Sequence, residues 1–280
     1  MSKSGYQNIL TKNLLLILVF FLQNIFAQEE FRLKISPEKI DKGYSIYADN
    51  DEFAPMSVMF DFELNNMKST VKNKQIIVIP SKSKKFFIGT VTQILPNKSY
   101  SFKYSSRFNI GNSNAIEYDQ DYVYELPFEK GKTHLVFQGY NGTFSHKGQN
   151  ALDFNLKEGD KVFAAREGTV IALAESSNRK CSTADCAKFN NFVRILHSDG
   201  SFAEYAHLKY NGVEVNEGDT VKKGQLIGYS GSTGWATGPH LHFSVYFNRL
   251  EGERTYLPTK FRTQNPAPEI LKEDRKYKRN

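Results

Sequence analysis

The sequence predicts an all-β protein with two β-rich domains, and three observations support this fold class. The composition, with 40% hydrophobic and 24% charged residues in a chain of 280, is that of folded globular proteins rather than of disordered chains. Apolar residues occur in short runs rich in Val, Ile, Phe and Tyr, separated by Asn, Lys, Gly and Pro, as strands are separated by turns. In the second half of the chain no stretch keeps helical periodicity for three turns, so we expect few helices there.

Residues 1–27 have the pattern of a secretory signal peptide. Lys3 and Lys12 precede an apolar run at 14–22, and Ala27 supplies the small residue expected before a cleavage point. The run is shorter than the roughly 18–20 residues that span a bilayer, although an uncleaved membrane anchor is the alternative interpretation. Cleavage after Ala27 would remove two lysines and no acid from a chain of formal charge +7. We therefore expect an exported protein, periplasmic or extracellular, with no stable membrane span after processing.

Residues 28–130 are predicted to form a β-sandwich-like accessory domain. Strands are expected at residues 56–64, 75–79, 85–91 and 100–104. The first and last of these alternate apolar with polar residues, which is the period of two expected where one face of a sheet is buried. This region contains no cluster of titratable side chains, so we expect scaffolding, substrate placement or shielding of an active site from it rather than catalysis.

Residues 131–262 are predicted to form the second domain, after a junction that contains Pro127 and Gly131. Strands are expected at residues 160–165, 168–173, 191–196, 202–206 and 242–246. The final segment, 263–280, has two prolines and many charges, so it is expected to be a polar, solvated tail.

Two cysteines, Cys181 and Cys186, lie in a loop-like run of the second domain. Export would place them in an oxidising compartment, where a loop-closing disulfide is expected. The alternatives are two free thiols or half of a metal site. The lysines of the chain are scattered rather than clustered with aromatic residues, so we expect no nucleic-acid partner, and we expect a monomer.

A pair of histidines, His240 and His242, is the first candidate for a functional site. The two residues lie in a run that is predicted to be a strand, where side chains at i and i+2 project from the same face about 7 Å apart. Both imidazoles can therefore address one site, although a purely structural role remains the alternative.

His146 and Asp153 are candidates for the remaining ligands of a hydrolytic metal site. Such a site needs three nitrogen or oxygen ligands from the protein and an open position for water. Asp153 lies between Leu152 and Phe154, where an uncompensated carboxylate would be costly to bury, and metal ligation would offset that cost. A turn or hydrogen-bonding carboxylate is the alternative for Asp153.

Together these motifs resemble the lysostaphin- and LytM-type zinc metallopeptidases. The resemblance rests on a His followed by an Asp, then Tyr-Ala-His-Leu at 205–208 and Gly-Pro-His-Leu-His-Phe at 238–243, and it covers roughly residues 138–246. It implies an antiparallel LytM-type catalytic domain that cleaves the stem or bridge peptides of bacterial peptidoglycan. The host envelope type and the bond that is cut are not implied.

The resemblance also implies a role for each of five residues. His146, Asp153 and His242 correspond to the zinc ligands of the family, and His207 and His240 to its two catalytic histidines. A water activated by zinc would attack the amide, one histidine would assist proton removal, and the other would stabilise the oxyanion or protonate the leaving amine. The division of these roles is left open.

One departure from the family concerns the spacing of the first two ligands. Family members commonly place the Asp four residues after the first His, whereas seven residues separate His146 from Asp153 here. The intervening residues 147–150 are loop-like, so they could bulge without moving either ligand.

One alternative to a peptidase is a protein that keeps the fold without catalysis. Degenerate relatives act as non-catalytic cell-wall-binding or regulatory proteins, but they lack zinc ligands, whereas every ligand and catalytic position is filled here. The remaining histidines, His134 and His197, belong to no ligand-spaced group and are expected to be structural or solvent-facing.

Overall fold

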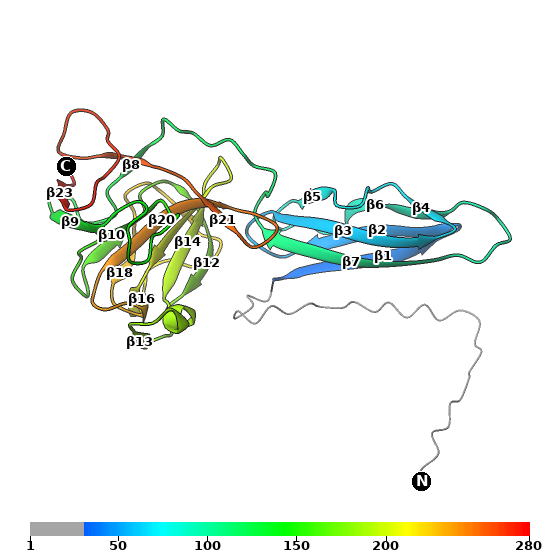
Figure 1. Cartoon of the computed structure of the whole chain (residues 1–280), viewed down its shortest axis with the longest axis horizontal. Helices are drawn as coiled ribbons and strands as arrows, with labels where there is room; N and C mark the ends of the chain where they lie inside the picture. The colour runs from blue at the N-terminus through cyan, green and yellow to red at the C-terminus, as the bar shows by residue number, and fades with distance from the viewer. Residues whose placement is uncertain (1–30) are drawn as a thin grey trace, which may run out of the picture.

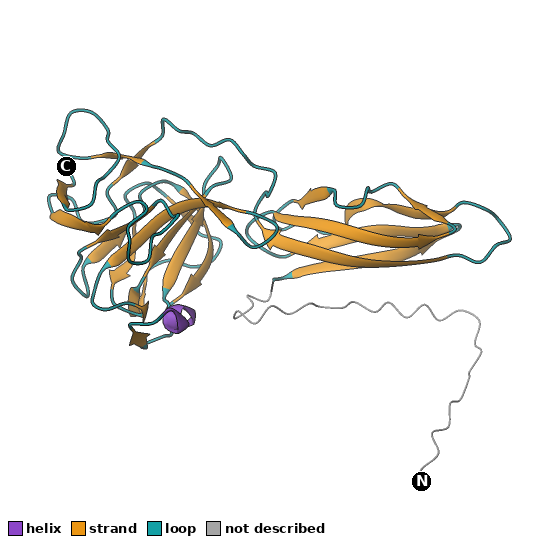
Figure 2. Ribbon diagram, in the orientation of Figure 1, coloured by secondary structure: helices purple, strands orange, loops and turns teal. Residues whose placement is uncertain are grey.

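The computed structural model describes residues 31–280, and these residues are built almost entirely of strands (Figures 1 and 2). This confirms the predicted all-β fold class. Within the described range the one helical element is a short 3-10 helix, η1 (Ala184–Phe189). That range also contains no helix with the length and apolar character needed to cross a bilayer. The predicted signal peptide, 1–27, lies outside the described residues.

The first part of the described chain is a pair of packed antiparallel sheets, in strand orders β1-β2-β6-β4 and β5-β3-β7. Their core contains Ile46 of one sheet and Val58 and Phe60 of the other, all fully buried. The alternation seen in the sequence arises because each sheet buries one face. The strands are β1 (Leu33–Ile40), β2 (Gly43–Asn50), β3 (Met56–Asn65), β4 (Met67–Ser69), β5 (Ile76–Ile79), β6 (Phe86–Gln93) and β7 (Ser101–Ile110).

The second part is organised around a large antiparallel sheet of strand order β17-β12-β14-β15-β20-β10-β9-β23, with β21 pairing β20 at one end. A smaller sheet, β11-β18-β16, shares its core. The strands of the large sheet are β9 (Thr133–Gln138), β10 (Ala151–Phe154), β12 (Gly168–Ala174), β14 (Phe192–Leu196), β15 (Phe202–Ala206), β17 (Thr220–Val221), β20 (Leu241–Asn248), β21 (Arg254–Tyr256) and β23 (Arg275–Lys278). Those of the smaller sheet are β11 (Lys161–Phe163), β16 (Leu208–Val213) and β18 (Leu226–Ser230).

The two faces of the large sheet differ in character, and β20 displays the difference. Leu241, Phe243 and Val245 point into the main apolar core. Because side chains alternate along a strand, His242 and Ser244 point to the opposite face. This opposite face is where the predicted site residues gather.

The disulfide predicted between Cys181 and Cys186 is present, with the two Cα atoms 5.8 Å apart. It brackets the start of η1 and lies beside a short parallel pair, β13 (Lys180–Cys181) and β19 (Gly234–Trp235). The bond closes a loop, as the sequence predicted, and the structure places this loop next to the predicted site.

The two parts of the chain lie end to end in Figure 1 and share a small apolar cluster. Met56 and Ile110 of the first part pack there with Phe202 and Tyr246 of the second, and all four are buried. Arg249 adds hydrogen bonds across the junction from Nη1 to the backbone oxygens of residues 113 and 115, at 3.2 and 2.7 Å. The first part is therefore packed against the second rather than tethered to it.

The change from one core to the other occurs earlier in the chain than residue 130. Strand β8 (Val123–Glu125) pairs in parallel with β22 (Lys260–Arg262). Tyr124, Leu126 and Phe128 are buried in the core of the second part. Pro127 and Gly131 predict a junction, but Phe128 between them packs inward. We propose that the first domain ends near residue 116.

The expectation of a solvated tail at 263–280 is wrong. Residues 275–278 form β23, an edge strand that pairs antiparallel with β9. Leu271 and Tyr277 are buried in the main core, at 2% and 4% exposure. Most charged residues of this segment are exposed, although Arg279 is buried, and that pattern misled the sequence prediction because an edge strand of this kind buries only one face.

Candidate metal and catalytic site

Asp153 and His242 are brought together by direct strand pairing. Asp153 of β10 is the register partner of His242 of β20, and cross-strand partners project side by side from the same face. The carboxylate Oδ1 lies 3.0 Å from His242 Nδ1. Asp153 is nearly fully buried at 4% exposure, so the sheet holds a carboxylate away from bulk water.

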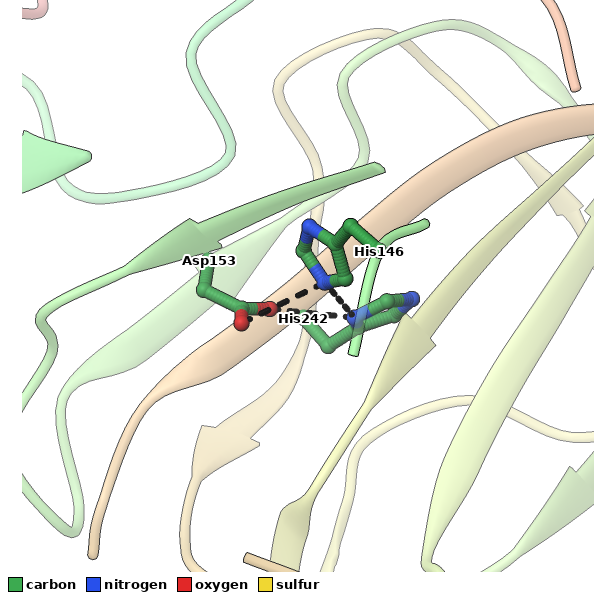
Figure 3. Close-up of side chains that lie close together, drawn as sticks. All are labelled: His146, Asp153 and His242. Carbon is green, nitrogen blue, oxygen red and sulfur yellow. Dashed lines mark hydrogen bonds and ion pairs between the residues drawn. The ribbon is translucent and has the colours of Figure 1, made fainter. Parts of the chain in front are cut away.

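His146 reaches the same point from the loop between β9 and β10 (Figure 3). Its Nε2 lies 3.3 Å from Asp153 Oδ2 and 3.3 Å from His242 Nδ1. Its Nδ1 donates a hydrogen bond to the carbonyl oxygen of Gly139 at 3.0 Å. The carbonyl fixes the tautomer, because a neutral ring that is protonated at Nδ1 presents the lone pair of Nε2 to the cluster.

The three side chains fit a tetrahedral metal ion. At ligand distances of about 2.0–2.2 Å from zinc, two ligand atoms lie roughly 3.3–3.6 Å apart. The distances between the atoms of His146, Asp153 and His242 fall close to this range, and all lie within 4.8 Å of one another. Two nitrogens and one oxygen are also the donor set that suits zinc in hydrolytic sites.

The cluster is built to hold positive charge. Burial opposes protonation of His146, but hydrogen bonding and the charge of Asp153 outweigh it, so the pKa of His146 is raised. Burial also disfavours the Asp153 carboxylate, yet the hydrogen bonds and charges of His146 and His242 hold its pKa well below the usual value. A proton or a metal cation would stabilise this cluster in the same way, because both carry the positive charge that neutralises a buried carboxylate facing nitrogen lone pairs.

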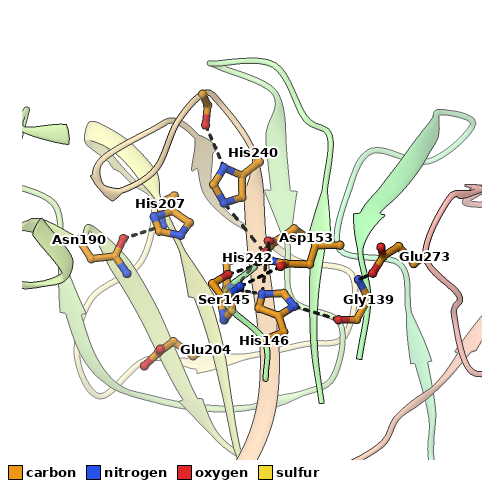
Figure 4. Close-up of polar contacts among 12 residues, drawn as sticks. Gly139, Ser145, His146, Asp153, Asn190, Glu204, His207, His240, His242 and Glu273 are labelled. Carbon is orange, nitrogen blue, oxygen red and sulfur yellow. Dashed lines mark hydrogen bonds and ion pairs between the residues drawn. The ribbon is translucent and has the colours of Figure 1, made fainter. Parts of the chain in front are cut away.

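His240 and His207 lie beside the cluster, with ring centroids 4.4 Å apart (Figure 4). His240 Nδ1 donates to the Gly238 oxygen at 2.9 Å, and its Nε2 is 4.0 Å from Asp153 Oδ1. His207 Nδ1 donates to the Thr233 oxygen at 2.8 Å. Burial lowers the pKa of both rings, that of His207 to about 3, so both are neutral at pH 7. Each then presents Nε2 as a proton acceptor.

The backbone at His207 is in the left-handed region, with φ of 62°. A non-glycine residue there is uncommon and needs support from its surroundings. The support is a hydrogen bond from the backbone N–H of His207 to Asn190 Oδ1 at 2.9 Å. The turn occurs where β15 ends and β16 begins, and it places the imidazole next to His240.

The structure brings all five predicted site residues together, and it adds partners that sequence reasoning missed. Gln138 donates to Asp153, and Asn190 and Thr233 hold His207. No spacing pattern marks these three, since each belongs to a different loop or strand end. His197 lies outside the cluster, buried, with Nδ1 donating to the Glu167 oxygen at 2.7 Å, and His134 packs on Phe128.

Residues 147–253 match the model of peptidase family M23. The chain carries an M23 peptidase domain. This agrees with the resemblance predicted from the motifs, and the matched residues lie within the second part of the chain. The match begins one residue after His146, so the place of that side chain in the M23 site rests on its geometry.

Several curated proteins are similar to this chain. Lysostaphin of Staphylococcus simulans is 35% identical over 125 residues, covering 44% of this chain and 22% of the relative. The peptidoglycan DD-endopeptidase ShyA of Vibrio cholerae is 33% identical over 96 residues, covering 34% of this chain and 20% of the relative. An uncharacterized metalloprotease of Buchnera aphidicola is 26% identical over 233 residues, covering 81% of this chain and 52% of the relative. The chain thus spans about half of the last relative and about a fifth of the first two.

Solved structures similar to the M23 domain include the catalytic domain of lysostaphin from Staphylococcus simulans. It is 26% identical, with a TM-score of 0.33, and the match covers 45% of this chain and 87% of that one.

Proposed function

We propose that this protein is an exported zinc endopeptidase that hydrolyses peptide cross-links of bacterial peptidoglycan. The observation that carries the proposal is the cluster of His146, Asp153 and His242, whose ligand atoms are spaced as a tetrahedral zinc site requires. The family match supports hydrolysis of a peptide bond. The cell wall as substrate is supported by relatives whose names specify peptidoglycan. Export is supported by the sequence pattern of residues 1–27.

Within this proposal the five side chains divide into two groups. His146, Asp153 and His242 would hold zinc, which supplies a Lewis acid that polarises the scissile carbonyl and acidifies a water molecule. His240 and His207 have neutral rings whose Nε2 atoms are free to accept a proton, because each Nδ1 is occupied by a backbone carbonyl. They would take the proton from the attacking water and return it to the leaving amine.

The first prediction separates metal binding from turnover. His242→Ala should lose stoichiometric zinc and all activity, because it removes a ligand. His207→Ala should keep zinc and lower kcat on the order of 100-fold or more, because it removes a group that handles the proton. Zinc content is measured by atomic absorption on purified protein, and turnover by digestion of purified cell walls followed by mass spectrometry of the fragments.

Walls with direct and with bridged cross-links are digested in parallel, because the site does not select between them. New amino termini in the fragments are required by an endopeptidase, and their absence would exclude this activity. His134→Ala serves as the control, since His134 lies outside the cluster, and it should match the wild type in zinc and turnover. Zinc retained in full by His242→Ala would overturn the assignment of ligands.

A further inference from the structure

A β-bulge in β9 lies directly beside the site. Asp153 pairs with Gln138, and Phe154 pairs with Val136, so Phe137 has no opposite residue on β10. Val136 packs in the main core. Regular alternation would point Gln138 to that same side, but the extra residue reverses the alternation and turns Gln138 toward Asp153. Bulges commonly re-aim a side chain in this way next to active sites.

The re-aimed Gln138 is buried, and its whole amide is engaged. Its Nε2 donates to Asp153 Oδ2 at 2.8 Å and to Ser145 Oγ at 2.8 Å. Its Oε1 accepts from the backbone N–H of Ser145 at 3.0 Å. This last bond assigns the oxygen and nitrogen of the Gln138 amide, because a backbone N–H can only donate and must therefore face the oxygen. The side chain therefore joins one ligand to the residue that precedes another, His146.

The neighbours of Gln138 touch the site as well. The ring of Phe137 packs edge-on against His240, with centroids 5.4 Å apart. The carbonyl oxygen of Gly139 accepts from His146, and its N–H donates to Glu273 Oε2 at 2.9 Å. Three consecutive residues of one strand end thus contact three of the five site residues.

We propose that Gln138 is the positioning residue of this metal site, an inference that rests on the proposed zinc role. It orients the Asp153 carboxylate and anchors Ser145, so that His146 and Asp153 converge despite the seven residues between them. The loop from 147 to 150 does not set this geometry by itself, because its residues are exposed or half-buried and its hydrogen bonds reach neither the His146 ring nor the Asp153 carboxylate. Partners of this kind typically contribute 10–100-fold to metal affinity.

The test measures zinc affinity directly. Gln138→Met keeps the length of the side chain and removes both its donors and its acceptor, whereas Gln138→Glu keeps the shape and places a second carboxylate against Asp153. Both proteins are stripped of metal, and the dissociation constant for zinc is obtained by competition with a chromogenic chelator. We expect a weakening on the order of 10–100-fold for Gln138→Met and a larger one for Gln138→Glu.

Gln149→Met is the matched control, because Gln149 lies in the same loop and its hydrogen bonds run through the backbone. It should bind zinc as the wild type does. Ser145→Ala offers a second route that leaves β9 intact, and it should weaken zinc binding by a smaller factor than Gln138→Met. Should Gln138→Met fail to fold, the comparison of Ser145→Ala with Gln149→Met decides the matter.

Each readout separates positioning from a general structural role. A structural role would lower the melting temperature of the metal-free protein and leave the zinc affinity of the folded fraction unchanged. Positioning also predicts that kcat falls at saturating zinc while KM stays within about twofold, because Gln138 acts through Asp153 and not on the substrate. Unchanged zinc affinity in folded Gln138→Met would overturn the inference. A wild-type protein that binds no zinc would overturn the proposed function as well, so the two failures differ.

Discussion

His197 is the residue whose burial has the clearest consequence for stability. It lies in the second part of the protein, 2% exposed, with Nδ1 donating to the Glu167 oxygen. Burial lowers its pKa to about 4, below the ordinary histidine value of 6.5. Its Nε2 has no hydrogen-bond partner among the described residues, so the neutral ring is held in an environment that cannot accommodate a second proton.

The pH dependence of folding follows from that shift. Above pH 6.5 the ring is neutral in both states and contributes nothing to the slope. Between pH 6.5 and 4 the unfolded chain binds a proton that the folded protein does not, so the free energy of unfolding falls as the pH falls, by up to about 3 kcal/mol from this group. His197→Asn keeps a donor for Glu167 and should flatten this part of the profile in urea melts. An unchanged slope would contradict the assignment.

At the scale of elements, the disulfide loop supports the histidine that the proposed mechanism uses. Cys181 pairs with Trp235 across β13 and β19, and its carbonyl accepts from the N–H of Ala236 at 3.1 Å. This fixes the segment that carries Thr233, one partner of His207. Asn190, the other partner, directly follows η1, which begins inside the disulfide loop. The loop therefore contributes to the position of His207 from two sides.

A variant with both Cys181→Ser and Cys186→Ser should keep zinc and lose on the order of tenfold in kcat, because His207 loses support while the ligands do not. Hydrogen exchange should rise at residues 180–190 and 231–236 and remain unchanged in β10. Zinc loss in this variant would show that the loop supports the metal ligands instead. Cys181→Ser alone would leave an unpaired thiol, so the double change is the cleaner comparison.

Burial explains why some strands could be predicted from the sequence and β23 could not. Strands such as β3 and β15 could be predicted because most of their residues are buried and their sequences are rich in apolar residues. β23 was missed because Tyr277 is the one buried residue among four, as befits a charged edge strand. The bulge at Phe137 was also missed, since a bulge is a property of two strands and one strand's sequence cannot display it. The motifs predicted that His146, Asp153 and His242 would lie together, and their role as metal ligands stays a prediction.

At the scale of the whole molecule, the first part packs against the same face of the large sheet that carries the site. Ala206 pairs with His242, and four residues further along the same two strands Phe202 pairs with Tyr246, where the cluster shared by the two parts begins. At about 3.3 Å per residue, this contact starts roughly 13 Å from His242. The first part is therefore close enough to limit what can lie across that end of the face, which fits the expected role in placement or shielding.

The shared cluster predicts that the two parts unfold together. Met56 is fully buried in it, so Met56→Ala should cost about 2–5 kcal/mol and lower the single calorimetric transition of the wild type. Val58→Ala is the control, since Val58 lies in the core of the first part alone. Two separate transitions in the wild type would contradict the coupling, whereas a split that appears only in Met56→Ala would support it.

The position of β9 between β10 and β23 gives the site a support that comes from far along the chain. Residues 146–242 contain the three proposed ligands, whereas β23 supplies the second neighbour of β9, and Glu273 accepts a hydrogen bond from the N–H of Gly139. Without β23, the edge of β9 directly beside the site would be open to pairing with another strand.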